Sequence, residues 1–195
     1  MFGGTFDPPH VGHLVAAVNA RHEAELDRVL LVVANEPWQK VGMRDLSPAG
    51  DRLAMVAAAV SGVASLEASD IEITRGGPSY TADTLQQLKD EDPTRELFLV
   101  LGSDAVAGLA TWEHTERLKD LAEIIVVDRP GTEGALPPDG YRYRVVEVPL
   151  LEVSSTDVRA RVADGRPLDY LLTPPVIECI QARGLYGAVT TGAAG

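Results

Sequence analysis

Three runs of consecutive apolar residues constrain the fold of this chain more strongly than any other feature. The runs are Arg28–Ala34 (RVLLVVA), Glu96–Leu101 (ELFLVL) and Glu123–Asp128 (EIIVVD). Each has the length of a strand and none alternates between apolar and polar residues, which is typical of parallel strands buried on both faces. Helical patterns separate the runs, so we expect an α/β fold: a doubly wound parallel sheet with flanking helices and a small helical C-terminal region.

The strand and helix patterns continue to residue 186 without an internal repeat, and we expect one domain over residues 1–186. Residues 187–195 (GAVTTGAAG) are small and carry no pattern, so we expect a disordered tail there. At the other end, only Met1 and Phe2 precede the first glycines, whereas a typical strand needs about five residues. We therefore expect the authentic start to lie upstream, with a longer first strand.

The charge balance and the single cysteine limit the classes of partner. The chain has 29 acidic and 17 basic residues and a net charge of −12, which argues against nucleic acid as the main partner. An anionic ligand must therefore find a local positive pocket. Cys179 cannot form an internal disulfide, and no signal peptide or apolar run of roughly 18 residues occurs. We expect a cytoplasmic protein with no membrane partner; a homo-oligomer remains open.

The first fourteen residues, MFGGTFDPPHVGHL, predict a phosphate-binding turn. Gly3 and Gly4 allow a tight turn and a close approach to a ligand, because neither carries a Cβ. A helix pattern begins near Val11, and the first amides of a helix, with its dipole, bind anions. His10 and His13 are three residues apart and share one face of that first turn. Two imidazoles beside such a helix start indicate phosphate chemistry.

Two other interpretations of the histidine pair are weaker. A transition metal usually takes three or four ligands, and only His22, His114 and Cys179 remain as further histidine or cysteine ligands. We therefore expect no metal bound directly by the protein. Two ordinary surface histidines on a helix would also give this spacing, but a second phosphate-binding motif later in the chain argues against coincidence.

That second motif is VSSTDVR, residues 153–159. Ser154 or Ser155 can cap a helix, and the hydroxyls and first-turn amides suit anionic oxygens. Arg159 lies one turn after Ser155, at i+4, where its planar guanidinium can bind phosphate. A capped helix alone would explain the serines but not the presence of both motifs in one chain.

Three further segments carry candidate ligand contacts. Lys40 lies in the loop that follows the first apolar run, at the end of a strand where α/β sheets bind ligands. Thr81 follows a Gly-Gly-Pro turn and is a plausible helix N-cap. Gly102 and Asp104 follow the second apolar run, and the acidic side chain suits ribose hydroxyls. Trp112 offers an indole face to an electron-poor ring.

These motifs together resemble one enzyme family. His10-Val11-Gly12-His13 resembles the HxGH signature of the nucleotidyltransferase superfamily, and GGTFDPPHVGHL resembles the opening of bacterial nicotinate-nucleotide adenylyltransferases. The segment SYTADTL (79–85) is similar to the family's SYTxDTL, and VSSTDVR to its ISSTxxR, with Val153 for the usual isoleucine. Gly102, Asp104 and Trp112 match its GxD…W pattern. The resemblance covers roughly residues 1–186.

The resemblance implies a Rossmann-like fold and adenylyl transfer from ATP to nicotinate mononucleotide, which yields nicotinate adenine dinucleotide and pyrophosphate. Mg²⁺ would arrive with ATP. The family often has Pro-Pro-His before a loop lysine that contacts ATP phosphates, whereas this chain has Pro-Trp-Gln. In this loop the resemblance therefore implies a role for Lys40 alone. The implied site residues are His10, His13, Lys40 and Arg159 for catalysis; Gly3, Gly4, Thr5, Phe6, Gly102, Asp104, Ser154, Ser155 and Thr156 for ATP; and Asp7, Thr81 and Trp112 for the mononucleotide.

Alternatives remain open at this stage. The acceptor could be nicotinamide mononucleotide, because no arginine is evidently dedicated to a nicotinate carboxylate. Phosphopantetheine is disfavoured by the SYTADTL segment and Trp112. A non-catalytic nucleotide-binding module on the same fold is a third class, although both phosphate-binding motifs are intact. A dinucleotide-binding dehydrogenase is disfavoured, since G-x-G-x-x-G is absent from the first turn.

Overall fold

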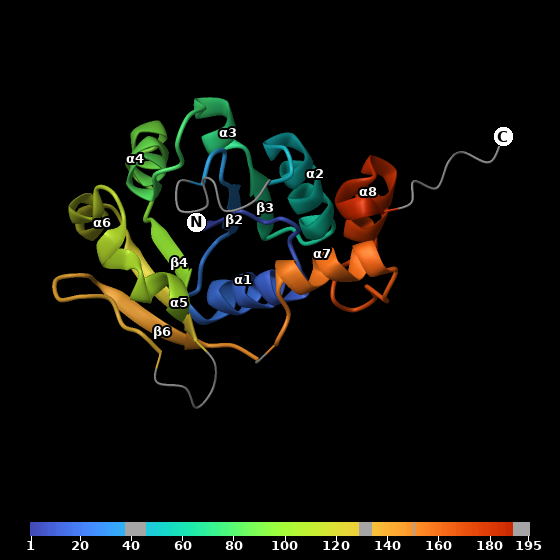
Figure 1. Ribbon diagram of the computed structural model, residues 1–195. Helices are drawn as coiled ribbons and strands as arrows, with labels where there is room; N and C mark the ends of the chain where they lie inside the picture. Colours follow the sequence, from blue (N-terminus) through green and yellow to red (C-terminus); the bar gives the residue numbers. More distant parts are fainter. Residues whose placement is uncertain (38–45, 129–133, 150, 189–195) are drawn as a thin grey trace.

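The computed structural model describes residues 1–37, 46–128, 134–149 and 151–188 (Figure 1). Within these ranges, six strands form two three-stranded sheets, β1-β2-β3 and β4-β5-β6, in which every pair of neighbours is parallel. The strands are β1 (Phe2–Gly4), β2 (Val29–Val33), β3 (Leu66–Ser69), β4 (Phe98–Gly102), β5 (Glu123–Asp128) and β6 (Tyr143–Glu147). The three apolar runs became β2, β4 and β5, as predicted.

Met1 joins the two sheets into one. Its amine donates a hydrogen bond to the carbonyl of Phe98 (2.7 Å), and its carbonyl accepts one from the amide of Val100 (2.9 Å). The strands therefore follow the order β3-β2-β1-β4-β5-β6, and the N-terminus lies in the middle of the sheet (Figure 1). In this order the chain reverses its direction of winding between β1 and β4, and α/β sheets bind ligands at the carboxyl ends of the strands at such a point.

Helices cover both faces of the sheet, which confirms the doubly wound prediction. The α-helices are α1 (Val11–Glu23), α2 (Ala49–Val60), α3 (Ile71–Arg75), α4 (Thr81–Glu91), α5 (Ser103–Ala107), α6 (Thr115–Leu121), α7 (Ser155–Asp164) and α8 (Pro174–Arg183), with 3-10 turns η2 (Leu109–Thr111) and η3 (Leu185–Gly187). No helix in the described ranges is long and apolar enough to cross a membrane.

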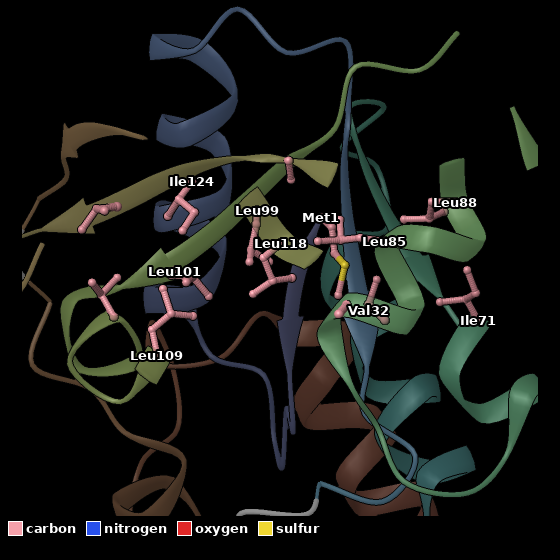
Figure 2. Close-up of a cluster of buried hydrophobic side chains, with 14 residues drawn as sticks. Met1, Val32, Ile71, Leu85, Leu88, Leu99, Leu101, Leu109, Leu118 and Ile124 are labelled. Carbon is pink, nitrogen blue, oxygen red and sulfur yellow. The ribbon is translucent and has the colours of Figure 1, made fainter. Parts of the chain in front are cut away.

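Successive residues of β4 belong to different core clusters. Leu99 and Leu101 pack with residues of α4, α5 and α6 in the cluster that Figure 2 shows around Met1 and Val32. Val100 packs instead with Ala20 of α1 on the opposite face. The strand is therefore buried on both sides, which is why its sequence lacks alternation.

The C-terminal helices pack on α2 rather than on the sheet. Met55 and Ala59 of α2 share a buried cluster with Val158 of α7 and with Val176 and Ile180 of α8. This packing places the first turn of α7 beside the start of α1, so two segments distant in sequence lie side by side (Figure 1).

Two boundaries differ from the predictions. Tyr80 is the N-cap of α4 and Thr81 is its first helical residue, so the capping role predicted for Thr81 is wrong. Gly187 lies in η3 and Ala188 packs against the α2–α8 cluster, so ordered structure continues beyond the expected boundary at residue 186. The remainder of the predicted tail, 189–195, lies outside the described residues.

Candidate active site

A cavity of about 290 Å³ opens at the carboxyl ends of β1 and β4. Six of the predicted site residues line it: Gly3, Gly4, Thr5, Thr81, Gly102 and Trp112. The turn after β1, the end of β4, the start of α4 and the segment after η2 therefore converge on one space. Its position at the reversal point of the sheet is the one expected for a ligand.

His10 and His13 form a stacked pair at the start of α1. Their ring centroids are 3.8 Å apart with an interplanar angle of 31°, and the ring of Phe6 lies edge-to-face with that of His13, with centroids 5.1 Å apart and an interplanar angle of 74°. The backbone N–H of His10 donates to Nδ1 of His13 (3.1 Å). A nitrogen that accepts carries no proton, so Nε2 of His13 bears the proton and is the donor of that ring.

Burial lowers the pKa of His10 to about 4. Its Nδ1 is buried and makes no hydrogen bond within the described ranges. His10 is therefore a neutral imidazole at pH 7, and an anionic ligand beside it would raise its pKa again.

Gly12, the glycine of the HxGH pattern, makes room for this pair. A Cβ at Gly12 would lie 3.0 Å from Nδ1 of His10 and 3.1 Å from a methyl group of Val153. Gly4 has a comparable reason, because a Cβ there would lie 2.8 Å from the ring of Phe6. Both glycines therefore preserve the packing of the rings that orient His13.

The first turn of α7 binds the turn that precedes α1. Of the two serines predicted as possible caps, Ser154 is the N-cap and accepts from the amide of Asp157. The hydroxyl of Ser155 donates to the carbonyl of Pro8 (2.8 Å), and Arg159 donates to the carbonyl of Asp7 (2.7 Å) and to Thr156 Oγ1 (3.1 Å). The structure thus brings the two phosphate-binding motifs together.

The buried guanidinium of Arg52 was missed by the sequence analysis. Arg52 is 1% exposed and donates to the carbonyls of Thr5 (3.0 Å), Ala34 (2.6 Å), Asn35 (3.1 Å) and Ser47 (2.9 Å). It connects the turn after β1 to the loop after β2. A lone arginine in the apolar, alanine-rich helix α2 is the signal that could have identified it.

Asp7 does not line the cavity. Its side chain is 1% exposed, and Oδ1 accepts a hydrogen bond of 2.6 Å from the hydroxyl of Tyr186 in η3. Burial, with this hydrogen bond, raises the pKa of Tyr186 above its usual range. The phenol therefore stays protonated and donates.

The other end of the cavity has a local hydrogen-bond network. Glu72 is 5% exposed, lines the cavity and accepts from the buried hydroxyl of Thr84 (2.7 Å). Arg75 donates to the same hydroxyl oxygen (2.9 Å), and Arg117 pairs with Asp83 (2.7 Å). These contacts attach α4 to the preceding α3 and the following α6. They were not anticipated, because the resemblance at SYTADTL (79–85) gave a ligand-binding role to Thr81 alone.

Two predicted residues lie apart from these groups. Asp104 is exposed in the first turn of the short helix α5. Lys40 lies outside the described residues. Over the described ranges, no group of three histidine, cysteine or acidic side chains could bind a metal ion.

Comparisons with known proteins agree on one family. Residues 1–161 match the cytidylyltransferase-like family model. A protein of Streptomyces coelicolor named "probable nicotinate-nucleotide adenylyltransferase" is 46% identical, over 94% of this chain and 98% of its own length. A protein of the same name from a Roseiflexus species is 45% identical, over 95% of this chain and 96% of its own length.

A solved structure shares the fold. It is the Plasmodium falciparum nicotinic acid mononucleotide adenylyltransferase complexed with NaAD, with a TM-score of 0.75 and 19% identity over 95% of each chain. At that identity the likeness supports the architecture described above.

Proposed function

The chain belongs to the nicotinate-nucleotide adenylyltransferases, within the cytidylyltransferase-like family, and from this premise we propose how its site works. The reaction is transfer of the adenylyl group of ATP to nicotinate mononucleotide, giving nicotinate adenine dinucleotide and pyrophosphate. One observation carries the proposal: the stacked His10–His13 pair at the start of α1. The pair does not line the cavity, but it follows in the chain the turn of Gly3, Gly4 and Thr5, which does.

The reaction needs no base to create its nucleophile. The phosphate monoester of the mononucleotide has a second pKa near 6 and is mostly dianionic at pH 7. One of its oxygens attacks the α-phosphorus of ATP, and the bond to the bridging oxygen of pyrophosphate breaks. Because one anion attacks another, the protein contributes positioning and neutralisation of charge.

We assign neutralisation of the α-phosphate to the start of α1. Nε2–H of His13 is a donor oriented by the His10 amide and by the rings on both sides. His10 can be protonated when phosphates arrive, because their charge favours the imidazolium. The backbone of residues 3–6 and the amides of the helix start add donors without adding a fixed charge.

We assign the β- and γ-phosphates to the first turn of α7, with Lys40. The catalytic turn is the segment of residues 6–10 before α1. Ser155 contacts Pro8 and Arg159 contacts Asp7, so the first turn of α7 lies beside it. The residues assigned to these phosphates are Ser154, Ser155, Thr156 and Arg159. ATP enters as its Mg²⁺ complex, so the metal belongs to the substrate. We assign the nucleotide sugars to Gly102, which lines the cavity at the end of β4, and to Asp104, which is exposed in the first turn of α5.

The mononucleotide occupies the cavity in this proposal. Its lining includes Trp112, whose indole can stack on the pyridine ring, and Thr81 at the start of α4, an 11-residue helix whose dipole favours the nicotinate carboxylate. Among the described lining residues none is an arginine or lysine. The preference for nicotinate over nicotinamide mononucleotide would therefore come from the backbone N–H groups at the start of α4.

Release of pyrophosphate with Mg²⁺–ATP tests the proposal. Nicotinate mononucleotide, nicotinamide mononucleotide and phosphopantetheine are compared as acceptors. We expect strong preference for the acid. Equal rates with both pyridine nucleotides would contradict the specificity, and binding of ATP without turnover on any acceptor would favour a non-catalytic module.

We also propose that the enzyme acts in the cytoplasm as one domain, which includes Gly187 and Ala188 beyond the predicted boundary at residue 186, and that it has no nucleic-acid partner. The net charge of −12 and the single cysteine support this view. Gel filtration with light scattering would determine whether it forms a homo-oligomer.

A further inference from the structure

The C-terminal turn η3 reaches the catalytic turn through one side chain. The hydroxyl of Tyr186 donates to Oδ1 of Asp7 at 2.6 Å, across 179 positions of the sequence, and lies 3.7 Å from Sδ of Met55. Met55 belongs to the apolar cluster that seats α7 and α8 on α2. Tyr186 therefore connects the packing of the C-terminal region directly to the residues before α1.

The position of Asp7 argues for a structural rather than a ligand-binding role. A carboxylate in direct contact with the mononucleotide would add repulsion at a site that must gather several phosphates. Asp7 is instead 1% exposed and absent from the cavity lining, and its carbonyl accepts from Arg159. The side-chain carboxylate and the backbone carbonyl of Asp7 thus both accept hydrogen bonds from the C-terminal region.

We propose that Tyr186 and Asp7 form a positioning pair for adenylyl transfer. The pair fixes residues 6–10, and with them the His10–His13 stack, relative to the phosphates bound at α7. This inference rests on the proposed function. It replaces direct contact between Asp7 and the mononucleotide, and it assigns a role to Tyr186, which no motif included.

The hydrogen bond should affect turnover more than substrate affinity. Phe6 of the same turn packs on Gly4 and contacts His13, so displacement of the turn moves the ring that donates to the α-phosphate. Small displacements of catalytic groups lower the rate steeply, whereas Trp112 and the start of α4 would still bind the mononucleotide.

Tyr186→Phe is the direct test, because phenylalanine keeps the ring that packs near Met55 and removes only the hydroxyl. We expect kcat to fall about tenfold while both KM values change by less than about threefold. Tyr170→Phe is the matched control, because Tyr170 has a similar positive φ (63° against 58°) but is 94% exposed. Thermal melting of each variant confirms that it is folded.

A double-mutant cycle tests whether Tyr186 acts through Asp7. In an Asp7→Ala background, Tyr186→Phe should have no further effect on kcat. Asp7→Asn, which keeps an oxygen acceptor for the phenol, should retain more activity than Asp7→Ala and provides a second test if Tyr186→Phe does not fold.

Three results would overturn the positioning pair: wild-type kcat in Tyr186→Phe, the same loss from that substitution with and without Asp7, or equal losses in Asp7→Asn and Asp7→Ala. Absence of pyrophosphate release by the wild-type protein would overturn the proposed function instead, so the two failures are distinguishable.

Discussion

The proposed site uses two helix starts, those of α1 and α4, and the contacts that position them differ in range. The residues before α1 are bound by Ser155, Arg159 and Tyr186, which lie 147, 152 and 179 positions from their partners. The contacts at the start of α4 span shorter separations. Thr84 contacts Glu72 and Arg75 at separations of 12 and 9, Asp83 pairs with Arg117 at 34, and Ser79 accepts from the amide of Asn35 at 44. The proposed catalytic end, at the start of α1, is therefore held by the far end of the chain, whereas the proposed acceptor end, at the start of α4, is held by elements nearer in sequence.

This difference separates two kinds of defect. Loss of a contact at α4 should change the affinity for the mononucleotide, because the surrounding elements still pack. Loss of a contact at α1 should change the chemical step or the stability, because the turn is assembled only when α2, α7 and η3 pack around it. The predictions below test this division.

The largest effect is expected at the catalytic end, in His13→Ala. Loss of one transition-state donor should lower kcat by roughly 10²–10³-fold. Pyrophosphate release measures it, with His22→Ala, an exposed change on the same helix, as the control. A loss below tenfold in a folded variant would remove His13 from this role.

Arg52→Met tests whether long-range contacts also carry stability. Four carbonyls lose a charged donor in a buried site, so the free energy of unfolding should fall by about 3 kcal/mol in urea titration. Arg28→Met is the matched control, because Arg28 pairs with Glu67 at the surface. This substitution should lower the free energy of unfolding by less than about 1 kcal/mol. Similar costs in both variants would contradict the structural role of Arg52.

Thr84→Val breaks the local network at α4 without changing side-chain shape. We expect the free energy of unfolding to fall by about 2 kcal/mol, because the carboxylate of Glu72 loses a buried donor. The KM for nicotinate mononucleotide should rise while the KM for ATP and kcat stay close to wild type. Thr74→Val, which removes an exposed hydrogen bond to Asp70, is the control. A fall in kcat instead would show that the two ends are coupled.

The same division explains what the sequence could predict. The apolar runs of β2, β4 and β5, the start of α1 at Val11 and the cap at Ser154 depend on neighbours along the chain, and these predictions were confirmed. The contacts of Tyr186 and Arg52 with the catalytic turn depend on packing between distant helices. The lone arginine in the apolar helix α2 marks Arg52 as unusual but does not say which carbonyls it binds, and nothing in the sequence marks Tyr186.

The cap predicted at Thr81 was wrong, whereas the contact predicted between Asp7 and the mononucleotide stays a prediction, which the burial of Asp7 disfavours. Both match a family motif, but a motif does not say which way a side chain points. Thr81 begins the helix that Tyr80 caps. Asp7 is turned into the protein interior toward Tyr186, which only the tertiary structure determines.

The smallest effect expected is the pH dependence that His10 gives to stability. Its pKa is about 4 when folded and about 6.5 when unfolded, so between these values the unfolded chain binds more protons. Stability from this residue is therefore fully present above pH 6.5 and is lost as the pH falls toward 4. Between pH 7 and pH 5.5 the loss should be about 1 kcal/mol relative to His10→Asn, because other titrating groups cancel in the difference.

Urea titrations of the two proteins at several pH values measure this difference. Equal slopes against pH would mean that His10 is solvated, and a reversed sign would mean that the folded site favours the imidazolium. Saturating Mg²⁺–ATP should shrink the slope, because phosphates beside His10 raise its folded pKa toward the unfolded value. The free energy of unfolding would then show, without a kinetic measurement, that the site around His10 favours a bound anion. The acceptor end should show no such response, since no histidine is among the described residues that line the cavity.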